Sequence, residues 1–483
     1  MSFLPFFSLE TWILLISFLF LFVMYGTWTF GVFEKLGIPC SKPLMYWGTT
    51  GRDHQVYYLA DAVCAQKYGK IWGMYELRKP ILAVMDPDMI KTILVKECFT
   101  YFTNRRNFRL NGELYDAVSI AEDNQWRRIR SLITPSFTSG RVKEMFVLMK
   151  HHSARLTENL QTKAEQDEVI CIKDYFGAYS LDVMASCALS VDLDSFKDPS
   201  GPFSTHAGKL FQFSVLLFLF QGFFPFFIPL LNLLGASLFN KSASAFFKTV
   251  VENMRAERLT DHEIISQATM FVFAGYETSS ATLCFLVYCL ARNPKIMKCL
   301  QKEIDATFPN KDPVTYEALM QMEYLDSVVN EGLRLYPPLA RLERMAKETV
   351  KINGTTIPKG MLVMVPVYAL HRDSDLWPEP EEFKPERFSK ENKQSINPYT
   401  YLPFGIGPRN CLGMRFAMAL VKLALVEVLQ TYSFEVCQET EIPLQMDPQG
   451  LVKPLRPIKL KVAKRCTEAA NLDYYCNNQG WRL

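Results

Sequence analysis

The sequence predicts a mainly α-helical protein with a small β region, attached to a membrane by one N-terminal helix. Residues 11–33 contain no charged side chain, which is typical of a membrane-spanning helix. A long apolar stretch, 261–292, starts with an acidic residue and ends before a proline, as a long helix does. Two short apolar runs, 71–75 and 81–85, flank a polar turn and predict a pair of strands.

Composition limits the possible functions. With 483 residues, 49% of them hydrophobic and 36 of them Phe, the chain can build a large core around an apolar cavity. The net charge of +3 argues against nucleic acid as a partner, because no face carries a basic excess. The twelve cysteines show no paired spacing, so we expect free thiols in a reducing compartment and no disulfide framework.

The uncharged N-terminal stretch is long enough to cross a bilayer. It covers 23 residues between Glu10 and Glu34, and a helix of that length extends roughly 34 Å, against about 30 Å of hydrocarbon. A cleaved signal peptide fits poorly, since the run is too long and Tyr25 and Trp28 stand where small residues would be needed. We therefore expect a retained membrane anchor.

Positive charges follow this anchor and do not precede it. Lys35, Lys42 and Arg52 lie just after the span, so the large C-terminal part is expected on the cytosolic side. We divide the chain into an anchor, 1–33, a main domain, 34–464, and a tail without a predicted role, 465–483.

One cysteine lies in an unusual loop. Residues 404–413 read Phe-Gly-Ile-Gly-Pro-Arg-Asn-Cys-Leu-Gly, and a helix is expected to open directly behind them, at Phe416. A helix N-terminus stabilises a thiolate such as that of Cys411, the glycines admit a flat and bulky group, and Arg409 can meet a carboxylate. A lone cysteine cannot complete a zinc site, whereas one axial thiolate suffices for a haem iron. The alternative is a surface loop with an inert cysteine.

This loop resembles the haem-thiolate loop of the cytochrome P-450 monooxygenases. The shared pattern is Phe-x-x-Gly-x-Arg-x-Cys-x-Gly, from Phe404 to Gly413. The resemblance implies a P-450 fold and a haem b whose iron is bound by Cys411, with Phe404 and Arg409 in the cofactor-binding loop. A dinucleotide-binding loop is rejected because Asn410 occupies the place of its third glycine.

The middle of the long helix carries Ala274-Gly275-Tyr276-Glu277-Thr278. The Thr278 hydroxyl can bond to the Ala274 carbonyl one turn earlier, and with Gly275 in the same turn we expect a local bulge. A threonine within a helix is usually inert, but this run resembles the family's oxygen-activation motif. The resemblance implies that Glu277 and Thr278 are catalytic and relay protons, and that Ala274 faces the haem.

Several charged residues have roles only through the same resemblance. Trp126 and Arg130 share one helix face; alone they suggest an exposed basic helix, whereas the family places such a pair against the haem propionates. Arg105 and Arg344 are implied as further propionate partners. A second set is implied to be structural, locking the core behind the haem: Glu331, Arg334 and Arg387.

The substrate pocket is expected to be apolar. By resemblance its lining includes five residues besides Ala274: Phe108, Ser119, Ile120, Phe273 and Leu339. Phe makes up eight of the seventeen residues in 211–227, which indicates either core packing or a lipophilic roof that dips into the membrane surface.

The resemblance is closest to the mammalian drug- and steroid-oxidising subfamily 3A. It implies a membrane enzyme of the endoplasmic reticulum that hydroxylates steroids, drugs and other xenobiotics with O2. Electrons come from NADPH through cytochrome P-450 reductase, with cytochrome b5 as an optional second partner. Whether Arg127, Arg128 and Lys422 form the reductase footprint is left open.

Two other functions stay open, and the first of them rests on a departure from that subfamily. Near Arg258 the chain skips a block of about thirty residues, which forces a short connection into the long helix. An impaired family member would only bind haem or a lipophile. A haem-thiolate isomerase or peroxide-using enzyme would need no reductase, although the intact acid–alcohol pair at Glu277 and Thr278 argues against it.

Overall fold

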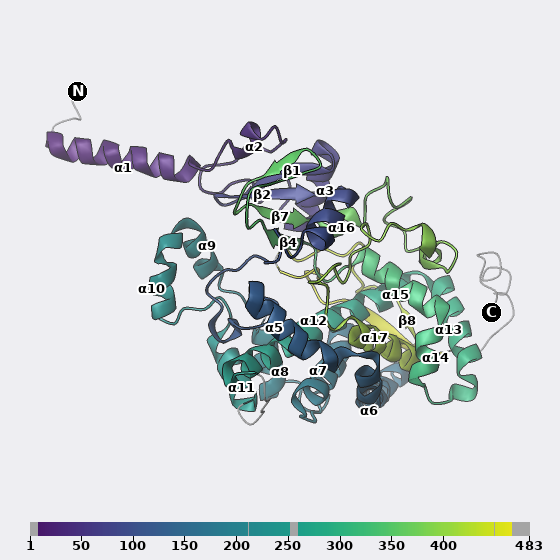
Figure 1. Cartoon of the computed structure of the whole chain (residues 1–483). Helices are drawn as coiled ribbons and strands as arrows, with labels where there is room; N and C mark the ends of the chain where they lie inside the picture. Colours follow the sequence, from purple (N-terminus) through teal and green to yellow (C-terminus); the bar gives the residue numbers. More distant parts are fainter. Residues whose placement is uncertain (1–7, 211, 252–258, 449, 466–483) are drawn as a thin grey trace.

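Helices dominate the structure, a computed structural model that describes residues 8–210, 212–251, 259–448 and 450–465. Figure 1 shows the helices gathered into one large body beside a smaller part that contains most of the strands. The helices are α1 Leu9–Thr27, α2 Val32–Lys35, α3 Tyr57–Tyr68, α4 Pro87–Lys91, α5 Asp123–Ile133, α6 Ser139–Glu165, α7 Ile172–Leu189, α8 Pro202–Lys209, α9 Val215–Phe223, α10 Ile228–Leu233, α11 Lys241–Val251, α12 Asp261–Arg292, α13 Pro294–Thr307, α14 Tyr316–Gln321, α15 Glu323–Leu335, α16 Val367–Leu370 and α17 Met414–Leu429.

The strands form three small sheets. The largest has the order β1-β2-β7-β4, the second β3-β9-β8, and β5 pairs with β6. The two strands expected from the sequence are β1 and β2, which pair antiparallel with Ile71 opposite Val84. The strands are β1 Ile71–Glu76, β2 Lys79–Val84, β3 Val169–Cys171, β4 Leu342–Met345, β5 Val350–Ile352, β6 Thr355–Ile357, β7 Leu362–Val365, β8 Tyr432–Glu435 and β9 Lys459–Lys464.

The long helix α12 runs through the main core. A capping box starts it, in which the Thr260 and Glu263 side chains and backbone N–H groups satisfy each other. Its C-terminal half is almost fully buried, from Ser279 to Ala291, against residues of α6, α7, α15 and α17. The fold class is therefore mainly α with small sheets, as the sequence predicts.

The N-terminal helix α1 extends away from the rest of the molecule (Figure 1). It is one of two described helices long and apolar enough to cross a membrane, and the other, α12, is largely buried inside the protein. The helix ends at Thr27, six residues before the uncharged stretch does. Phe33 belongs to the globular core instead, because its ring packs where a Cβ on Gly73 would lie, 2.3 Å away. The helix α1, a candidate membrane span, is thus shorter than the uncharged stretch.

The Phe-rich segment folds into a bent helical pair, α9 and α10, whose axes differ by 107°. Many of its large apolar side chains are exposed, among them Leu216, Phe226 and Leu233. Core packing therefore does not account for this composition. We call the segment from Val215 to Leu233 the Phe-rich hairpin.

Two features noted in the sequence lie outside the described residues: the shortened connection at Arg258 and the C-terminal tail beyond Arg465. The cysteines depart partly from expectation. Nine described cysteines carry free thiols, but Cys299 is in a disulfide.

Candidate functional site

The cysteine loop is held open by its own backbone. The Cys411 N–H donates to the Phe404 carbonyl at 2.8 Å, and the Asn410 N–H donates to the Gly407 carbonyl at 3.0 Å. Gly407 has φ +76°, and a Cβ there would lie 2.1 Å from the Leu94 carbonyl oxygen. Only glycine fits this position, because the left-handed backbone and the close approach both exclude a side chain.

Cys411 is exposed and lies just before α17, which begins at Met414, two residues earlier than the sequence predicts. Although its side chain can be reached by solvent, the densely packed chain around Cys411 raises the pKa of its thiol by desolvation. The Gly413 N–H and the nearby Arg105 and Arg130 partly offset this rise. These three groups stabilise the thiolate, which is the form that binds a metal.

Four buried or half-buried arginines gather at this loop. One of them, Arg409, belongs to the loop itself, and we call Arg105, Arg130, Arg344 and Arg409 the arginine cluster. Arg130 donates to the Asn410 carbonyl and side chain at 3.0 and 2.9 Å, and Arg105 donates to the Arg409 carbonyl at 2.9 Å. Within the described part of the chain, no member of the cluster forms an ion pair with a carboxylate. Their contacts are mainly to carbonyl oxygens.

The positive charges of the arginine cluster repel one another. Burial, followed by the positive charge of the neighbouring Arg105, lowers the pKa of Arg344 to about 9. The pKa of Arg409 is also lowered to about 9, by burial first and then by Arg105 and Arg344. In addition, Nε of Arg344 is buried without a hydrogen-bond partner. Buried cations without counter-charges are unfavourable, so an anionic ligand would stabilise this cluster.

Haem carries the negative charges that this cluster would bind. Its two propionate carboxylates would supply the counter-charges that the cluster lacks and an acceptor for Nε of Arg344. Its flat ring needs the close backbone approach that the glycines at 405 and 407 allow, and both have positive φ. The residues present therefore fit the group that the sequence predicts.

Arg409 contacts several carbonyl oxygens outside its own loop. Its Nε donates to the Thr103 carbonyl at 2.8 Å, and its Nη atoms donate to the carbonyls of Val118 and Ala121 at 3.2 and 2.8 Å. Trp126 lies flat beside it, with the guanidinium 4.1 Å from the ring centroid. Arg409 thus ties the cysteine loop to residues 103–121. Its expected contact with a carboxylate of the cofactor stays a prediction.

The expected bulge in α12 is not formed. The Thr278 hydroxyl does donate to the Ala274 carbonyl, at 2.5 Å, but α12 stays regular from Asp261 to Arg292. Gly275 serves another purpose, because a Cβ there would lie 2.3 Å from Sδ of Met184 on α7. The glycine allows α7 to pack closely against α12. Ala274 is exposed, as a residue facing a cofactor would be.

The acid of the acid–alcohol pair has a cationic partner. Nζ of Lys173, on α7, lies 2.8 Å from a carboxylate oxygen of Glu277 and donates to the Ser280 hydroxyl at 2.7 Å. Burial lowers the pKa of Lys173, but Glu277, Tyr276 and Cys284 together outweigh this effect, and the pKa is raised overall. The sequence analysis missed Lys173, because it lies 104 positions from Glu277.

The second set of arginines is paired. Arg334 donates to both carboxylate oxygens of Glu331, at 2.7 and 2.9 Å, and Nε of Arg387 donates to the same carboxylate at 3.3 Å. Glu331 and Arg334 are fully buried on α15. We call these three residues the carboxylate-paired arginines. They lie together as the resemblance implies.

The expected pocket residues fall into separate groups. Ile120 and Phe273 pack on one apolar cluster, and the Ser119 hydroxyl contacts Sδ of Met270 in that cluster at 3.3 Å. Phe108 packs instead against Phe218 of the Phe-rich hairpin, with ring centroids 5.9 Å apart. Leu339 is exposed.

Two of the three basic residues considered for a reductase footprint have carboxylate partners. Lys422 is buried, with Nζ 3.0 Å from a carboxylate oxygen of Asp326, and Arg128 pairs with the buried Glu263. Arg127 lies over the exposed ring of Phe99, 5.0 Å from its centroid. Lys422 is therefore removed from any such surface.

Comparisons with known proteins agree with this site. The family model for cytochrome P450 matches residues 39–462. Cytochrome P450 3A40 of Oryzias latipes is 54% identical over 96% of this chain and 99% of its own length. Cytochrome P450 3A27 of Oncorhynchus mykiss is 53% identical over 98% of both chains. Cytochrome P450 3A29 of Sus scrofa is 50% identical over 96% of this chain and 99% of its own.

The alignments also bear on length. The one with the Oncorhynchus mykiss protein spans 506 positions, whereas this chain has 483 residues. The relative therefore has residues that this chain lacks. The match nevertheless covers nearly the whole of both proteins. The chain belongs to the cytochrome P450 family and is a P450 monooxygenase whose cofactor is haem.

Proposed function

We propose that this P450 hydroxylates lipophilic small molecules, such as steroids, drugs and other xenobiotics, at the endoplasmic reticulum membrane. Its main domain faces the cytosol and receives electrons from NADPH–cytochrome P450 reductase, with cytochrome b5 as a second donor. The observation that carries the proposal is the exposed Cys411 thiol beside an arginine cluster that has no carboxylate partner. The subfamily 3A names of its relatives support the substrate class.

Each residue of the loop side has a distinct task. Cys411 binds the iron as a thiolate, and haem, when bound, supplies the chemistry that activates dioxygen. Arg105, Arg130 and Arg344 hold the carboxylates of the cofactor. Arg409 and Trp126 keep the loop in place, because the guanidinium of Arg409 donates to three carbonyls outside that loop.

The opposite side handles protons. The hydroxyl of Thr278 holds a proton at Oγ1, where it donates to the Ala274 carbonyl. The Glu277 carboxylate accepts a hydrogen bond from Lys173, and this contact holds the acid beside Thr278. Together the two residues place a donor and an acid on adjacent positions of α12, in keeping with general acid catalysis.

Reductase-dependent turnover tests this proposal. We expect the full chain, reconstituted in phospholipid vesicles with reductase, to form a hydroxylated steroid only when NADPH and O2 are both present. Thr278→Ala should lower product formation per NADPH consumed by about 10²-fold or more, in line with the loss of a general acid–base group. The matched control is Thr282→Ala, since Thr282 makes the same type of back-bond one turn later. Product without reductase would instead support an isomerase or a peroxide-using enzyme.

A second function is favoured by the length comparison. The chain lacks residues that the Oncorhynchus mykiss relative has, and an impaired protein that only binds haem or a lipophile would follow if the missing block closes the active site. Such a protein would bind a steroid with a spectral change yet consume no NADPH above background.

A further inference from the structure

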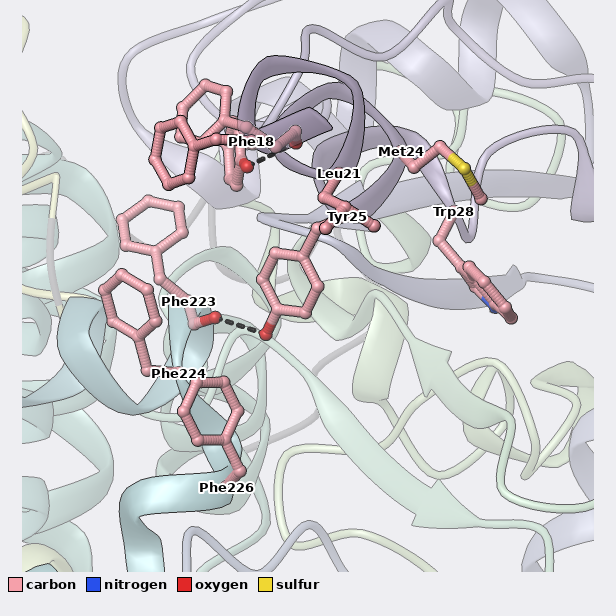
Figure 2. Close-up of a pocket in the computed structure, with 10 residues that line it drawn as sticks. Phe18, Leu21, Met24, Tyr25, Trp28, Phe223, Phe224 and Phe226 are labelled. Carbon is pink, nitrogen blue, oxygen red and sulfur yellow. Dashed lines mark hydrogen bonds between the residues drawn. The ribbon is translucent and has the colours of Figure 1, made fainter. Parts of the chain in front are cut away.

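A groove separates the anchor helix α1 from the Phe-rich hairpin. Its volume is about 680 Å³, within the range of pockets that hold one small molecule. Figure 2 shows aromatic side chains from both elements facing this space. Phe18, Phe22, Tyr25 and Trp28 come from α1 and the residues just after it, and Phe224 and Phe226 come from the hairpin. Two elements about 200 positions apart in the sequence therefore build one site.

Hydrogen bonds hold the two walls together. The Tyr25 hydroxyl donates to the Phe223 carbonyl at 2.6 Å, which is one of the carbonyls left unpaired at the end of α9. Arg78 lies 3.5 Å from the centroid of the Tyr25 ring, and its Nη1 donates to the Tyr25 carbonyl at 2.7 Å. The groove is thus formed before any ligand enters it.

The groove offers hydrocarbon and almost nothing else. Its two hydroxyls, those of Tyr25 and Tyr46, already donate to the carbonyls of Phe223 and Phe22. Besides the indole N–H of Trp28, a side chain that is largely exposed, the described lining has no donor left to orient a polar ligand. An unbranched hydrocarbon chain fits these conditions, because its burial needs no polar partner.

The groove also opens where a bilayer would be. Leu21 and Phe22 line it and belong to α1, the described span nearest the N-terminus. Phe226 lines it from the other side, and the hairpin continues outward with exposed Leu230 and Leu233. The groove is therefore continuous with two apolar surfaces that contact lipid if α1 spans the membrane.

We propose that this groove binds one acyl chain of a membrane phospholipid. The bound chain fills the space between anchor and hairpin and so fixes the angle at which the main domain meets the membrane. Neither the haem site nor the oxidation of a substrate is required for this binding, so the inference stands apart from the proposed function.

Photolabelling tests the proposal on the full chain. The protein is reconstituted in phosphatidylcholine vesicles that contain a phosphatidylcholine with a photoreactive diazirine in one acyl chain, and the labelled peptides are mapped. We expect label on both walls, at 18–28 and at 223–226, well above that on the outer part of α1. Phe224→Ser should reduce the label on the α1 wall about tenfold, because it removes a half-exposed aromatic ring from the groove wall, where a bound acyl chain would cover it.

Two variants control for general disruption. Leu233→Ser removes an equally apolar but fully exposed hairpin side chain outside the groove, and it should leave the labelling unchanged. Tyr25→Phe keeps the ring and removes only the hydroxyl bonded to Phe223, so it should lower the label on the hairpin wall without unfolding the protein. Retained haem absorbance confirms that each variant is folded.

Three results would overturn the proposal. Label spread evenly along α1 would show ordinary bilayer contact without a site. Loss of the label when a steroid is added would assign the groove to substrate. Cross-links between two copies of the chain through 223–226 would assign it to self-association.

Discussion

The two sets of buried arginines in this protein have opposite surroundings. Arg334 and Arg387 share the buried carboxylate of Glu331, whereas Arg344 and Arg130 rest mainly on carbonyl oxygens beside the cysteine loop. The first set has its counter-charge within the chain and the second has none. We infer from this difference that the first set is a structural ion-pair network and that the second is a binding site for an anionic ligand.

The two sets should respond differently to the loss of one charged side chain. Removing a carboxylate from the first set leaves two buried cations unpaired, so the fold loses stability. Removing a cation from the second set relieves repulsion between arginines, so the apoprotein loses nothing while the cofactor loses a partner. The predictions below test this contrast, from the largest expected effect to the smallest.

Glu331→Gln should be the most damaging single change. Gln keeps the size of the side chain but leaves Arg334 and Arg387 without their counter-charge, which we expect to cost about 3–5 kcal/mol of unfolding free energy. The measurement is urea unfolding of the apoprotein, followed by its far-ultraviolet circular dichroism. A loss below about 1 kcal/mol, the size of a surface pair, would show that these arginines do not depend on Glu331.

Arg344→Met should act on the cofactor and spare the fold. We expect haem affinity to fall by about 1.5–3 kcal/mol, the value of one hydrogen bond to a charged group, and the apoprotein to be at least as stable as before. Haem loss to an excess of a haem-scavenging globin measures the first, and urea unfolding of the apoprotein measures the second. If Arg344→Met destabilised the apoprotein as Glu331→Gln does, both sets would be structural locks.

The paired region should also confer sensitivity to acid. His371 is fully buried beside Arg334: its Nδ1 contacts the Arg334 carbonyl at 3.2 Å, and its Nε2 accepts from the Leu402 N–H at 2.8 Å. Burial, followed by the Arg334 charge, lowers the pKa of His371 to about 3. Below about pH 6.5 the His371 side chain binds a proton in the unfolded chain but stays neutral in the folded protein. The stability of the fold therefore falls as the pH drops from about 6.5 towards 3.

This contribution amounts to about 2 kcal/mol between pH 6.5 and pH 5, at about 1.4 kcal/mol for each pH unit. Urea unfolding midpoints at the two pH values measure it. In His371→Gln, whose side chain does not titrate, the difference between the two pH values should shrink by this amount. An unchanged difference would mean that other groups set the acid sensitivity.

The smallest effect is expected at an exposed pair on α6. Arg141 and Glu144 lie 2.7 Å apart and are both largely exposed. Glu144→Gln therefore makes the same chemical change as Glu331→Gln in solvent, and it should leave the urea unfolding midpoint nearly unchanged, because a surface ion pair adds little stability. An effect close to that of Glu331→Gln would show that burial is not what gives the paired arginines their weight.

Local patterns predict much of this fold. The bounds of α12 follow from an acidic start and a proline after its end, and β1 and β2 lie within two residues of their expected positions. The end of α1 could not be predicted in this way. The absence of charged residues in 11–33 does not reveal that Phe33 lies beyond the end of α1 and packs over Gly73. That contact depends on a strand about forty positions later.

The site shows the same limit. Spacing brings Cys411, Arg409 and Thr278 to attention, yet it cannot reveal which partners the fold supplies. Gly275 suggests a bulge in sequence, whereas its neighbour in space is Met184 of another helix. Lys173 reaches Glu277 from α7, and the donors of Arg409 end on carbonyls of distant loops. Motifs identify reactive groups, and tertiary contacts decide how each one is engaged.

The central claim is that Cys411 binds the haem iron as a thiolate while the arginine cluster holds the carboxylates of the same cofactor. The carbon monoxide difference spectrum of reduced membranes tests it most directly, with Cys411→Ser compared with Cys437→Ser, a free thiol on another loop. We predict the red-shifted Soret band of a thiolate-bound haem in the unmodified protein and in Cys437→Ser, and its loss in Cys411→Ser. The same band and the same oxidase activity in Cys411→Ser would contradict the account.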